Sequence, residues 1–323
     1  MILRRDLLKQ AGSAIPALAS AGFMNKARAA PAASAIRLSV FTDEITSDFG
    51  KAVEIAAGEF GLHSVEVRNL WNKSLASLDE KELAEAARLL DRHKLRISCI
   101  ASPLFKVDWP GAPLSEHSPN KKSGKPPATL AEQDQLLEKY LELCKRFQVH
   151  ILRCFDFWRL EDQAKYRQAI DDKIAAAARK AGEKGIVLAL ENEYACNTGS
   201  TSEAARILKA IPLPGFQLLW DPGNSMFAGE SPYPDAYRQL PANRIAHVHC
   251  KDALQVNGKW EWAAVGKGKI EFVGLFQALE KAGFKGALSL ETHWKGGGTK
   301  EESTRQSMRG LKEVLEKAKV AWN

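Results

Sequence analysis

The segment IVLALENEYACNTGSTSEAARILKAIPLPGFQLLWD, residues 186–221, contains two short apolar runs separated by a longer stretch of mixed polar and apolar residues. The runs IVLALE (186–191) and FQLLW (216–220) are rich in β-branched or large apolar residues, as buried strands are. Glu191 ends the first run, and Asp221 directly follows the second. The segment therefore predicts a strand, a helix and a second strand, with an acidic side chain at the C-terminal end of each strand.

Six further runs of the same kind indicate that this unit repeats around a closed barrel. They are IRLSVF (36–41), HSVEVR (63–68), LRISCI (95–100), HILRCF (150–155), IAHVHC (245–250) and ALSLE (287–291). Between the runs, apolar residues recur at helical spacing, as Leu83, Ala86 and Leu90 do. Eight alternating strands and helices predict one α/β domain, a (β/α)8 barrel of the TIM type. An open doubly wound sheet is disfavoured, because the first run leads into FTDEITSDFG (41–50) instead of a glycine-rich phosphate loop.

The first thirty residues have the three parts of an export signal. RRDLLK (4–9) contains paired arginines, residues 11–24 are apolar and mostly small, and ARA (27–29) fits a cleavage site. Together they predict a twin-arginine signal peptide over residues 1–30 and the barrel over residues 31–323. The apolar stretch is too short to span a bilayer, which needs about 20 apolar residues. We therefore expect a periplasmic protein with no integral membrane segment after the signal is removed.

The charge of the chain gives no reason to expect a nucleic-acid partner. Without residues 1–30, which hold five cations and one anion, the formal net charge falls from +7 to +3. The remaining Lys and Arg residues are spread along the predicted helices. The five cysteines are odd in number and widely spaced, so we expect no disulfide framework, although Cys196 could face a pocket close behind Glu191.

Side chains that commonly bind metals lie at the C-terminal ends of the last four strand-like runs. They are Glu191, Asp221, His249 and Glu291. Active sites of such barrels gather at that end of the strands, and alternate residues of a strand share one face, so we expect the four to converge. Three carboxylates and one imidazole suit a single divalent ion. Mn²⁺, Mg²⁺ or Co²⁺ fits this set best, and Zn²⁺ or Fe²⁺ is also compatible with it.

The same residues suggest proton transfer next to a carbonyl group. A proton α to a sugar carbonyl is weakly acidic, so its removal needs a base and a positive charge against the developing oxyanion. Glu191 and Glu291 lie on runs at different sides of the ring and could act as base and acid at opposite faces of one carbon. Lys251 shares the strand face of His249 and could neutralise an oxyanion or pair with a carboxylate at the rim.

Three more residues are candidates for contact with the substrate. His247 lies one layer deeper than His249 and could touch the substrate or support its neighbour. Glu66 and Arg68 share a face of the second run and could form a buried pair or bind the substrate. The segment from Ala101 to Thr129, rich in Pro, Gly, Ser and Lys, is either a lid over bound substrate or a passive insertion.

Five strings of the sequence closely resemble those of a known superfamily. They are LALEN (188–192), LLWDPGN (218–224), HVHCKD (247–252), VGKGKIEF (265–272) and LSLET (288–292). Together they resemble the xylose-isomerase-like superfamily of TIM-barrel sugar isomerases and epimerases, which also contains endonuclease IV-like proteins. The resemblance spans the predicted mature chain. It implies that one divalent metal is bound by Glu191, Asp221, His249 and Glu291, and that the two glutamates act as acid and base.

The resemblance also implies substrate-binding roles for Glu66, Asn224 and Lys251. The chain departs from the pattern at two positions. Asn224 stands where many epimerases have His, and Glu193 stands where a His often follows the fifth-strand Glu. Both departures bear on how the substrate is held more than on the metal.

We therefore expect an exported, metal-dependent isomerase or epimerase that acts on an unphosphorylated sugar or sugar derivative through an enediolate. GKGK (266–269), the one candidate phosphate cradle, reads better as the turn into the next helix. A lyase or hydratase of 3-keto-glycosides would use the same metal and base, and a non-catalytic sugar-binding protein also stays open. DNA repair is disfavoured, because few histidines lie at strand ends and the phosphate-binding footprint is missing. A homo-oligomer is compatible with the sequence.

Overall fold

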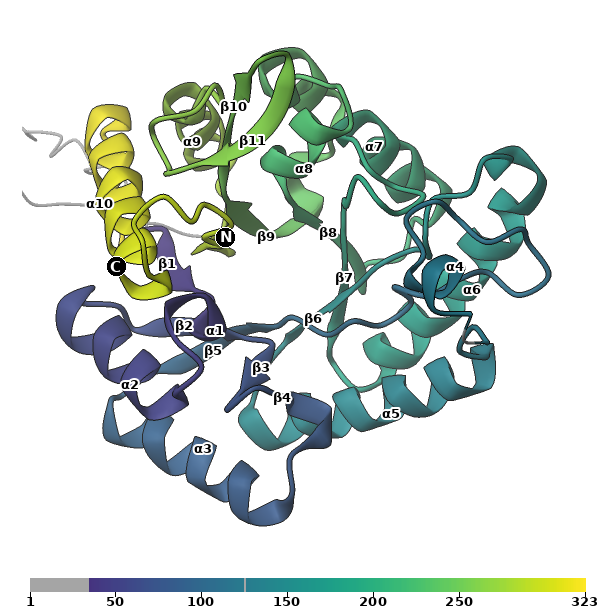
Figure 1. Ribbon diagram of the computed structural model, residues 1–323, viewed down its shortest axis with the longest axis horizontal. Helices are drawn as coiled ribbons and strands as arrows, with labels where there is room; N and C mark the ends of the chain where they lie inside the picture. The colour runs from purple at the N-terminus through teal and green to yellow at the C-terminus, as the bar shows by residue number, and fades with distance from the viewer. Residues whose placement is uncertain (1–34, 125) are drawn as a thin grey trace, which may run out of the picture. The chain divides into compact units, whose positions relative to one another are not determined.

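Eight parallel strands form one sheet that curls into a ring, as Figure 1 shows for the computed structural model. The structure describes residues 35–124 and 126–323, so the signal peptide predicted for residues 1–30 lies outside the described residues. The strands follow one another around the ring in the order β1-β12-β9-β8-β7-β6-β5-β2. They are β1 (Arg37–Val40), β2 (Ser64–Val67), β5 (Arg96–Ile100), β6 (Ile151–Cys154), β7 (Val187–Glu191), β8 (Phe216–Trp220), β9 (Ile245–Cys250) and β12 (Ala287–Leu290).

Strands β1 and β2, at the two ends of this order, nearly close the ring. A parallel bridge joins Phe41, directly after β1, to Glu66 of β2. On its other side β1 pairs with β12 along its whole length, from Arg37 opposite Ala287 onward. The eight strands coincide with the eight apolar runs of the sequence, so the predicted (β/α)8 barrel is confirmed.

Helices surround the ring on its outer side (Figure 1). The longer ones are α3 (Glu80–Arg92), α5 (Leu130–Phe147), α6 (Gln163–Glu183), α7 (Thr201–Ala210), α9 (Phe272–Lys281) and α10 (Lys300–Ala318). The shorter ones are α1 (Thr42–Ile45), α2 (Phe49–Glu54), α4 (Pro119–Ser123) and α8 (Pro222–Phe227). Single 3₁₀ or π turns lie at Ile55–Glu59, Leu75–Ser77, Pro232–Ala236, Tyr237–Gln239 and Ala242–Arg244. Across the described residues, the helices are too short or too polar to span a membrane.

Local signals in the sequence explain where the outer helices begin and which face they bury. Reciprocal capping boxes start α3, α5 and α7, with Asp79, Thr129 and Ser200 as the N-cap residues. Helix α3 then buries Leu83 and Leu90 in the hydrophobic core, as the helical spacing predicts. The caps fix where these helices begin, and the buried apolar face of α3 fixes the side that it turns to the core.

Two antiparallel hairpins extend the barrel beyond the ends of its strands. The pair β3 (Asn69–Leu70) and β4 (Lys73–Ser74) follows β2, and the pair β10 (Asp252–Val256) and β11 (Lys259–Ala263) follows β9. The second hairpin begins two residues after Cys250, the last residue of β9, so it forms part of the wall at the end of the barrel where Glu191, Asp221 and Glu291 also lie.

The segment from Ala101 to Thr129 is anchored to the barrel where it begins. Backbone N–H groups of residues 155, 157 and 158 donate to the carbonyl groups of residues 104, 105 and 107. Phe105 is fully buried, and its N–H donates to Gln133 Oε1 at 2.8 Å. The first part of the segment is therefore barrel wall. That the rest forms a lid over substrate stays a prediction.

All five cysteines are buried and free. Cys196, which the sequence places near the site, is fully buried and forms a backbone bridge with Trp158. Burial raises the pKa of its thiol well above the ordinary value. A buried, protonated thiol is a poor nucleophile, so Cys196 packs as a small apolar side chain.

Asp156, just beyond β6, fastens the loop that follows β7. Its Oδ1 accepts a hydrogen bond from the Thr198 N–H at 3.0 Å, and its Oδ2 accepts one from Thr198 Oγ1 at 2.6 Å. Burial raises the pKa of Asp156 to about 6, and the hydrogen bonds from Thr198 offset only part of this effect. The loop that carries Glu193 is therefore held by a carboxylate whose ionisation is costly.

We expect the pH dependence of unfolding to report the ionisation of Asp156. Its pKa is about 6 in the native protein, against an ordinary value of 3.8. The free energy of unfolding should fall as the pH rises through this window, by up to about 3 kcal/mol, because the native state must lose a proton that the unfolded state has already lost. Asp156→Asn lacks this component. Chemical denaturation of both proteins measures it, and a difference between them that stays constant from about pH 4 to pH 7 would contradict the assignment.

Candidate functional site

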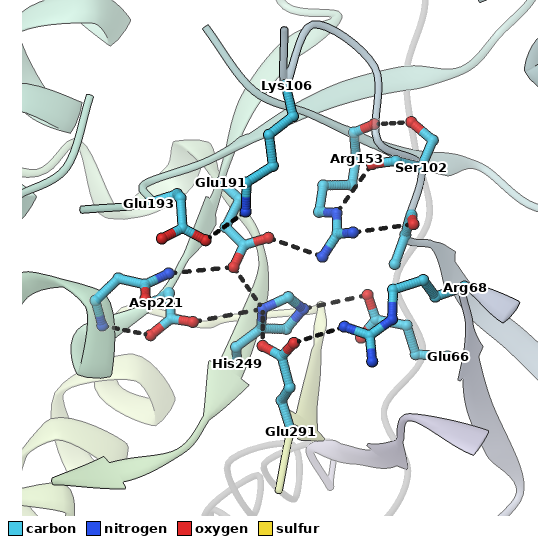
Figure 2. A network of polar contacts seen from close by, with 12 residues as sticks. Glu66, Arg68, Ser102, Lys106, Arg153, Glu191, Glu193, Asp221, His249 and Glu291 are labelled. Carbon is cyan, nitrogen blue, oxygen red and sulfur yellow. Dashed lines mark hydrogen bonds and ion pairs between the residues drawn. The ribbon is translucent and has the colours of Figure 1, made fainter. Parts of the chain in front are cut away.

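Four buried residues converge at one end of the barrel. They are Glu191, Asp221, His249 and Glu291, whose ligand atoms all lie within 4.8 Å of one another. His249 is central, with Nδ1 at 3.2 Å from Glu191 Oε1, 3.3 Å from Glu291 Oε2 and 3.6 Å from Asp221 Oδ2. Figure 2 shows the three carboxylates arranged around this ring. The structure therefore brings together the four residues predicted to bind a metal, and that role stays a prediction.

The string DPGN (221–224) explains the position of Asp221. Asp221 is the N-cap of α8, and its Oδ1 accepts the N–H of Asn224 at 2.8 Å. Pro222 takes the first helical position, where a free N–H is not needed. The side chain of Asn192 bonds both the N–H and the carbonyl of Asp221, at 2.7 and 2.8 Å. With Oδ1 committed to the helix, Oδ2 faces the site, where the Lys251 ammonium lies 2.8 Å from it.

The second ring nitrogen of His249 is held by Glu66. His249 Nε2 lies 3.2 Å from Glu66 Oε1, and His247 Nε2 lies 2.9 Å from Glu66 Oε2. A carboxylate can only accept, so both imidazoles donate to it and Nδ1 of His249 is left facing the other three carboxylates. Proteins commonly orient a metal-bound histidine in this way. All three side chains are fully buried, so none of them is in contact with solvent.

In each of the two glutamates, one carboxylate oxygen accepts a hydrogen bond from an arginine and the other faces His249. Arg153 Nη1 donates to Glu191 Oε2 at 2.9 Å, and Arg68 Nη1 donates to Glu291 Oε1 at 3.1 Å. Figure 2 shows the two ion pairs on either side of the imidazole. Charge-assisted bonds of this kind fix the direction of a carboxylate. The pairing therefore aims Glu191 Oε1 and Glu291 Oε2 into the site.

Arg68 does not pair with Glu66, so that alternative from the sequence is wrong. Its Nε donates to Asp43 Oδ2 at 2.9 Å, and its Nη2 donates to Glu44 Oε1 at 2.8 Å. With Glu291 as a third partner, the guanidinium joins the end of β1 to the end of β12. Arg68 thus lies in the site, where it contacts a proposed metal ligand directly.

Both glutamates are held in the ionised form. Burial raises the pKa of Glu191, but the charges of His249 and Arg153 more than offset it and lower the pKa to about 2. Burial also raises the pKa of Glu291, and the charge of Lys251 is the largest of several that bring it well below the usual value. Deprotonated carboxylates can serve as metal ligands or as bases at neutral pH.

Lys251 and Asn224 complete the inner group. Lys251 Nζ lies 2.8 Å from both Asp221 Oδ2 and Glu291 Oε2, so it forms the ion pair with a rim carboxylate that the sequence allowed. Asn224 Nδ2 donates to Glu191 Oε1 at 3.3 Å. Of the residues predicted to contact substrate, Arg68, Asn224 and Lys251 therefore border the glutamates.

Two residues of the site, Arg153 and Lys106, could not be predicted from the sequence. Arg153 is buried in β6. The one sign of it in the sequence is that a charged residue interrupts the apolar run HILRCF (150–155). Lys106 Nζ pairs with Glu193 Oε2 at 2.8 Å and lies 4.5 Å from the centre of the Phe155 ring. Its place above the site follows from the path of the segment after β5, for which the sequence offers no local signal.

The donor set fits one divalent ion. Ligand atoms about 2.0–2.3 Å from a common ion are at most some 4.6 Å apart, close to the 4.8 Å limit met here. Asp221 offers the buried Oδ2, which its helix does not use, and His249 offers Nδ1. The nearby carboxylates of Glu66 and Glu191 overcome burial and raise the pKa of His249, so an ion binding at Nδ1 would release a proton. The set as a whole is rich in oxygen, which suits Mn²⁺, Mg²⁺ or Co²⁺.

Two curated proteins are similar to part of the chain. A protein of Escherichia coli (strain K12) named as a candidate L-ribulose-5-phosphate 3-epimerase is 24% identical over 192 residues, which cover 57% of this chain and 66% of that protein. An inosose dehydratase of Geobacillus thermodenitrificans (strain NG80-2) is 28% identical over 126 residues, covering 34% of this chain and 42% of that protein. The chain thus spans less than two thirds of the length of either relative.

Solved structures and a family model match most of the length of the chain. The IolI protein with a bound zinc atom superposes with a TM-score of 0.70 at 16% identity, covering 88% of this chain and 99% of that one. A D-allulose 3-epimerase from Methylomonas sp. in complex with D-allulose gives 0.62 at 17% identity, covering 88% and 97%. At such identities the likeness concerns the fold. Residues 55–314 match the family described as xylose isomerase-like TIM barrel. The chain therefore belongs to the xylose isomerase-like TIM barrel family.

Proposed function

We propose that the chain is a divalent-metal-dependent isomerase or epimerase of an unphosphorylated sugar or sugar derivative. The observation that carries the proposal is the buried cluster in which three carboxylates and His249 present their ligand atoms within 4.8 Å of one another. Relatives named as an epimerase and as dehydratases support chemistry at a carbon next to a carbonyl group. A non-catalytic sugar-binding protein would have no use for two glutamates whose free oxygens are aimed at one space by paired arginines.

In this proposal Glu191 and Glu291 transfer the proton. One carboxylate takes the proton from the carbon beside the carbonyl, and the electron pair of the broken C–H bond passes into an enediolate. The other carboxylate, having taken up a proton from solvent, returns it at the opposite face and inverts the carbon. A bound divalent ion would stabilise the negative charge on the neighbouring oxygen. Arg153 and Arg68 keep each glutamate pointed at the substrate throughout.

The turn GKGK (266–269) supports a substrate without a phosphate group. Asp252 Oδ2 accepts the N–H groups of Gly266 and Gly268 at 2.9 and 2.8 Å, and its Oδ1 accepts that of Ile270 at 3.3 Å. A Cβ atom at Gly268 would lie 2.0 Å from Asp252 Oδ1, so the close approach requires glycine. The N–H groups that could hold a phosphate are therefore taken by a carboxylate, which would also repel one.

A lyase or hydratase acting on a keto-sugar, such as a 3-keto-glycoside, is the second candidate. The observation that favours it is that several curated relatives are named inosose dehydratase, at 26–28% identity. The same base would remove the proton, and the electron pair would then expel a substituent from the next carbon instead of accepting a proton again. The products separate the two reactions: epimerisation conserves the mass of the substrate, whereas elimination divides it or removes water.

We also propose that the protein is exported to the periplasm. The twin-arginine pattern of residues 1–30 supports this, because that route carries folded proteins and lets the metal bind before export. Cell fractionation tests the proposal, and a processed protein that stays in the cytosol would refute it.

Removal of the metal should abolish the activity. The test incubates the protein in D₂O with a panel of free ketoses and 3-keto-glycosides and follows loss of the α-proton by NMR, after treatment with a chelator and again after Mn²⁺ is added back. We expect exchange to stop on chelation and to return with Mn²⁺, because the divalent ion would supply the main positive charge that stabilises the enediolate. Exchange that continues in protein shown by mass spectrometry to hold no metal would refute the metal dependence.

A further inference from the structure

The ammonium group of Lys251 lies among the proposed metal ligands. Nζ is 2.8 Å from Asp221 Oδ2, 2.8 Å from Glu291 Oε2 and 3.9 Å from Glu191 Oε1. These are the same three oxygens that face His249 Nδ1. The side chain of Lys251 is only 4% exposed, so its charge is balanced almost entirely by these carboxylates.

The path of the Lys251 side chain is fixed by α8 and by the β10–β11 hairpin. A Cβ atom on Gly223 would lie 2.9 Å from Lys251 Cγ and 3.0 Å from Trp262 Cζ3, so the helix backbone packs directly on both side chains. Nζ lies 5.1 Å from the centre of the Trp262 ring, within the range of a cation–π contact. The stem therefore packs on Gly223, and its ammonium lies within reach of both the carboxylates and the Trp262 ring.

An ion bound by the four ligands would compete with this ammonium. Its ligand oxygens would lie about 2.0–2.3 Å from it, in the space where Nζ makes its 2.8 Å contacts, and two cations repel strongly at such a separation. Building on the metal site of the proposed function, we propose that Lys251 is an internal competitor of the metal. Metal binding displaces its ammonium toward Trp262, and release of the metal lets the ammonium return to the carboxylates.

The exchange gives one side chain two uses. When the ammonium lies among the carboxylates, it balances the negative charges of Asp221 and Glu291, which would otherwise be buried without this partner. With the ammonium displaced, its charge lies at the wall of the site beside Trp262, where it can bind an oxygen of the substrate. The affinity for the metal is then lower than the four ligands alone would give.

The test measures Mn²⁺ affinity, with free ion followed by electron paramagnetic resonance. Lys251→Met removes the competing charge and keeps the apolar stem, so we expect it to bind Mn²⁺ about tenfold or more tightly than the wild type. Lys106→Met is the matched control, since Lys106 is a partly buried lysine that pairs with Glu193 and with none of the four ligands. Its affinity should stay within about twofold of the wild type. If Lys251→Met does not fold, a crystal structure of the wild type with Mn²⁺ tests the same point, and Nζ should lie beyond hydrogen-bonding distance of Asp221.

Two results would overturn the inference: a folded Lys251→Met protein that binds Mn²⁺ no more tightly than the wild type, or a Mn²⁺ complex in which Nζ keeps its contact with Asp221. Both leave the proposed function standing, since each presupposes a metal-binding wild type. If neither the wild type nor Lys251→Met binds a divalent ion, the proposed metal site itself fails. Binding by the variant alone supports the competition.

Discussion

Replacing Glu291 by Gln should lower the rate of α-proton exchange by about 10²–10⁴-fold while leaving the barrel folded. The carboxylate is 3% exposed, directs Oε2 into the site and is held ionised by the positive charges around it. Gln keeps the size of the side chain and can still meet the Arg68 guanidinium through its carbonyl oxygen, but it cannot accept the proton. Exchange is measured in D₂O at saturating Mn²⁺, with bound metal determined by mass spectrometry.

The control for this prediction is Glu313→Gln, which makes the same chemical change on the exposed face of α10 and should leave exchange unaltered. Circular dichroism shows whether both variants are folded. If folded Glu291→Gln retains its metal and exchanges protons at the wild-type rate, the acid/base assignment is refuted. If it loses its metal, the residue acts mainly as a ligand, and Glu191→Gln then becomes the informative variant.

Replacing Glu66 by Gln should weaken Mn²⁺ binding about 10–100-fold, although Glu66 is not among the four proposed ligands. Glu66 is fully buried and ionised, because the charges of His249 and His247 outweigh the effect of burial and hold its pKa well below the usual value. Its two oxygens fix both imidazoles. Gln offers one acceptor and one NH₂ group, so one of the two rings loses its partner and His249 is no longer held with Nδ1 toward the other ligands.

Glu193→Gln is the matched control for the Glu66 variant. Glu193 lies above the same site but pairs with Lys106, so its replacement should change Mn²⁺ affinity by no more than about twofold. Titration of all three proteins by the same method gives the comparison. An unchanged affinity in folded Glu66→Gln would mean that other contacts orient His249, and the supporting role given to Glu66 would have to be abandoned.

The barrel and its central cluster could be predicted from the sequence because each depends on local pattern plus one general rule. The eight apolar runs appear as strands, and parallel strands end at the same side of a barrel. Glu191 and His249 must then approach each other once the ring forms, although 58 positions separate them in the chain. The string DPGN (221–224) likewise predicts its own structure, since Asp and Pro are the preferred first residues of a helix.

The partners of the charged residues could not be predicted, because they depend on how distant elements pack. Glu66 and Arg68 sit two residues apart in the second run, yet they bind opposite groups, Glu66 the histidines of β9 and Arg68 the carboxylates near β1 and β12. The strand pairing of β2 is also irregular next to Glu66. Arg153 is a charged residue in an apolar run, and only the closed ring places it beside Glu191. In each case the choice of partner is made by the barrel as a whole.

The way Asp252 occupies the GKGK turn has a consequence for protein engineering. A designer who wished this scaffold to accept sugar phosphates would gain little from adding lysines, because the amides of Gly266 and Gly268 are already committed to an internal carboxylate. Asp252 itself would have to be replaced, and this would also remove the hydrogen bond between the start of the β10–β11 hairpin and Ile270, just before α9. Altered specificity and an intact scaffold are thus coupled through a single aspartate.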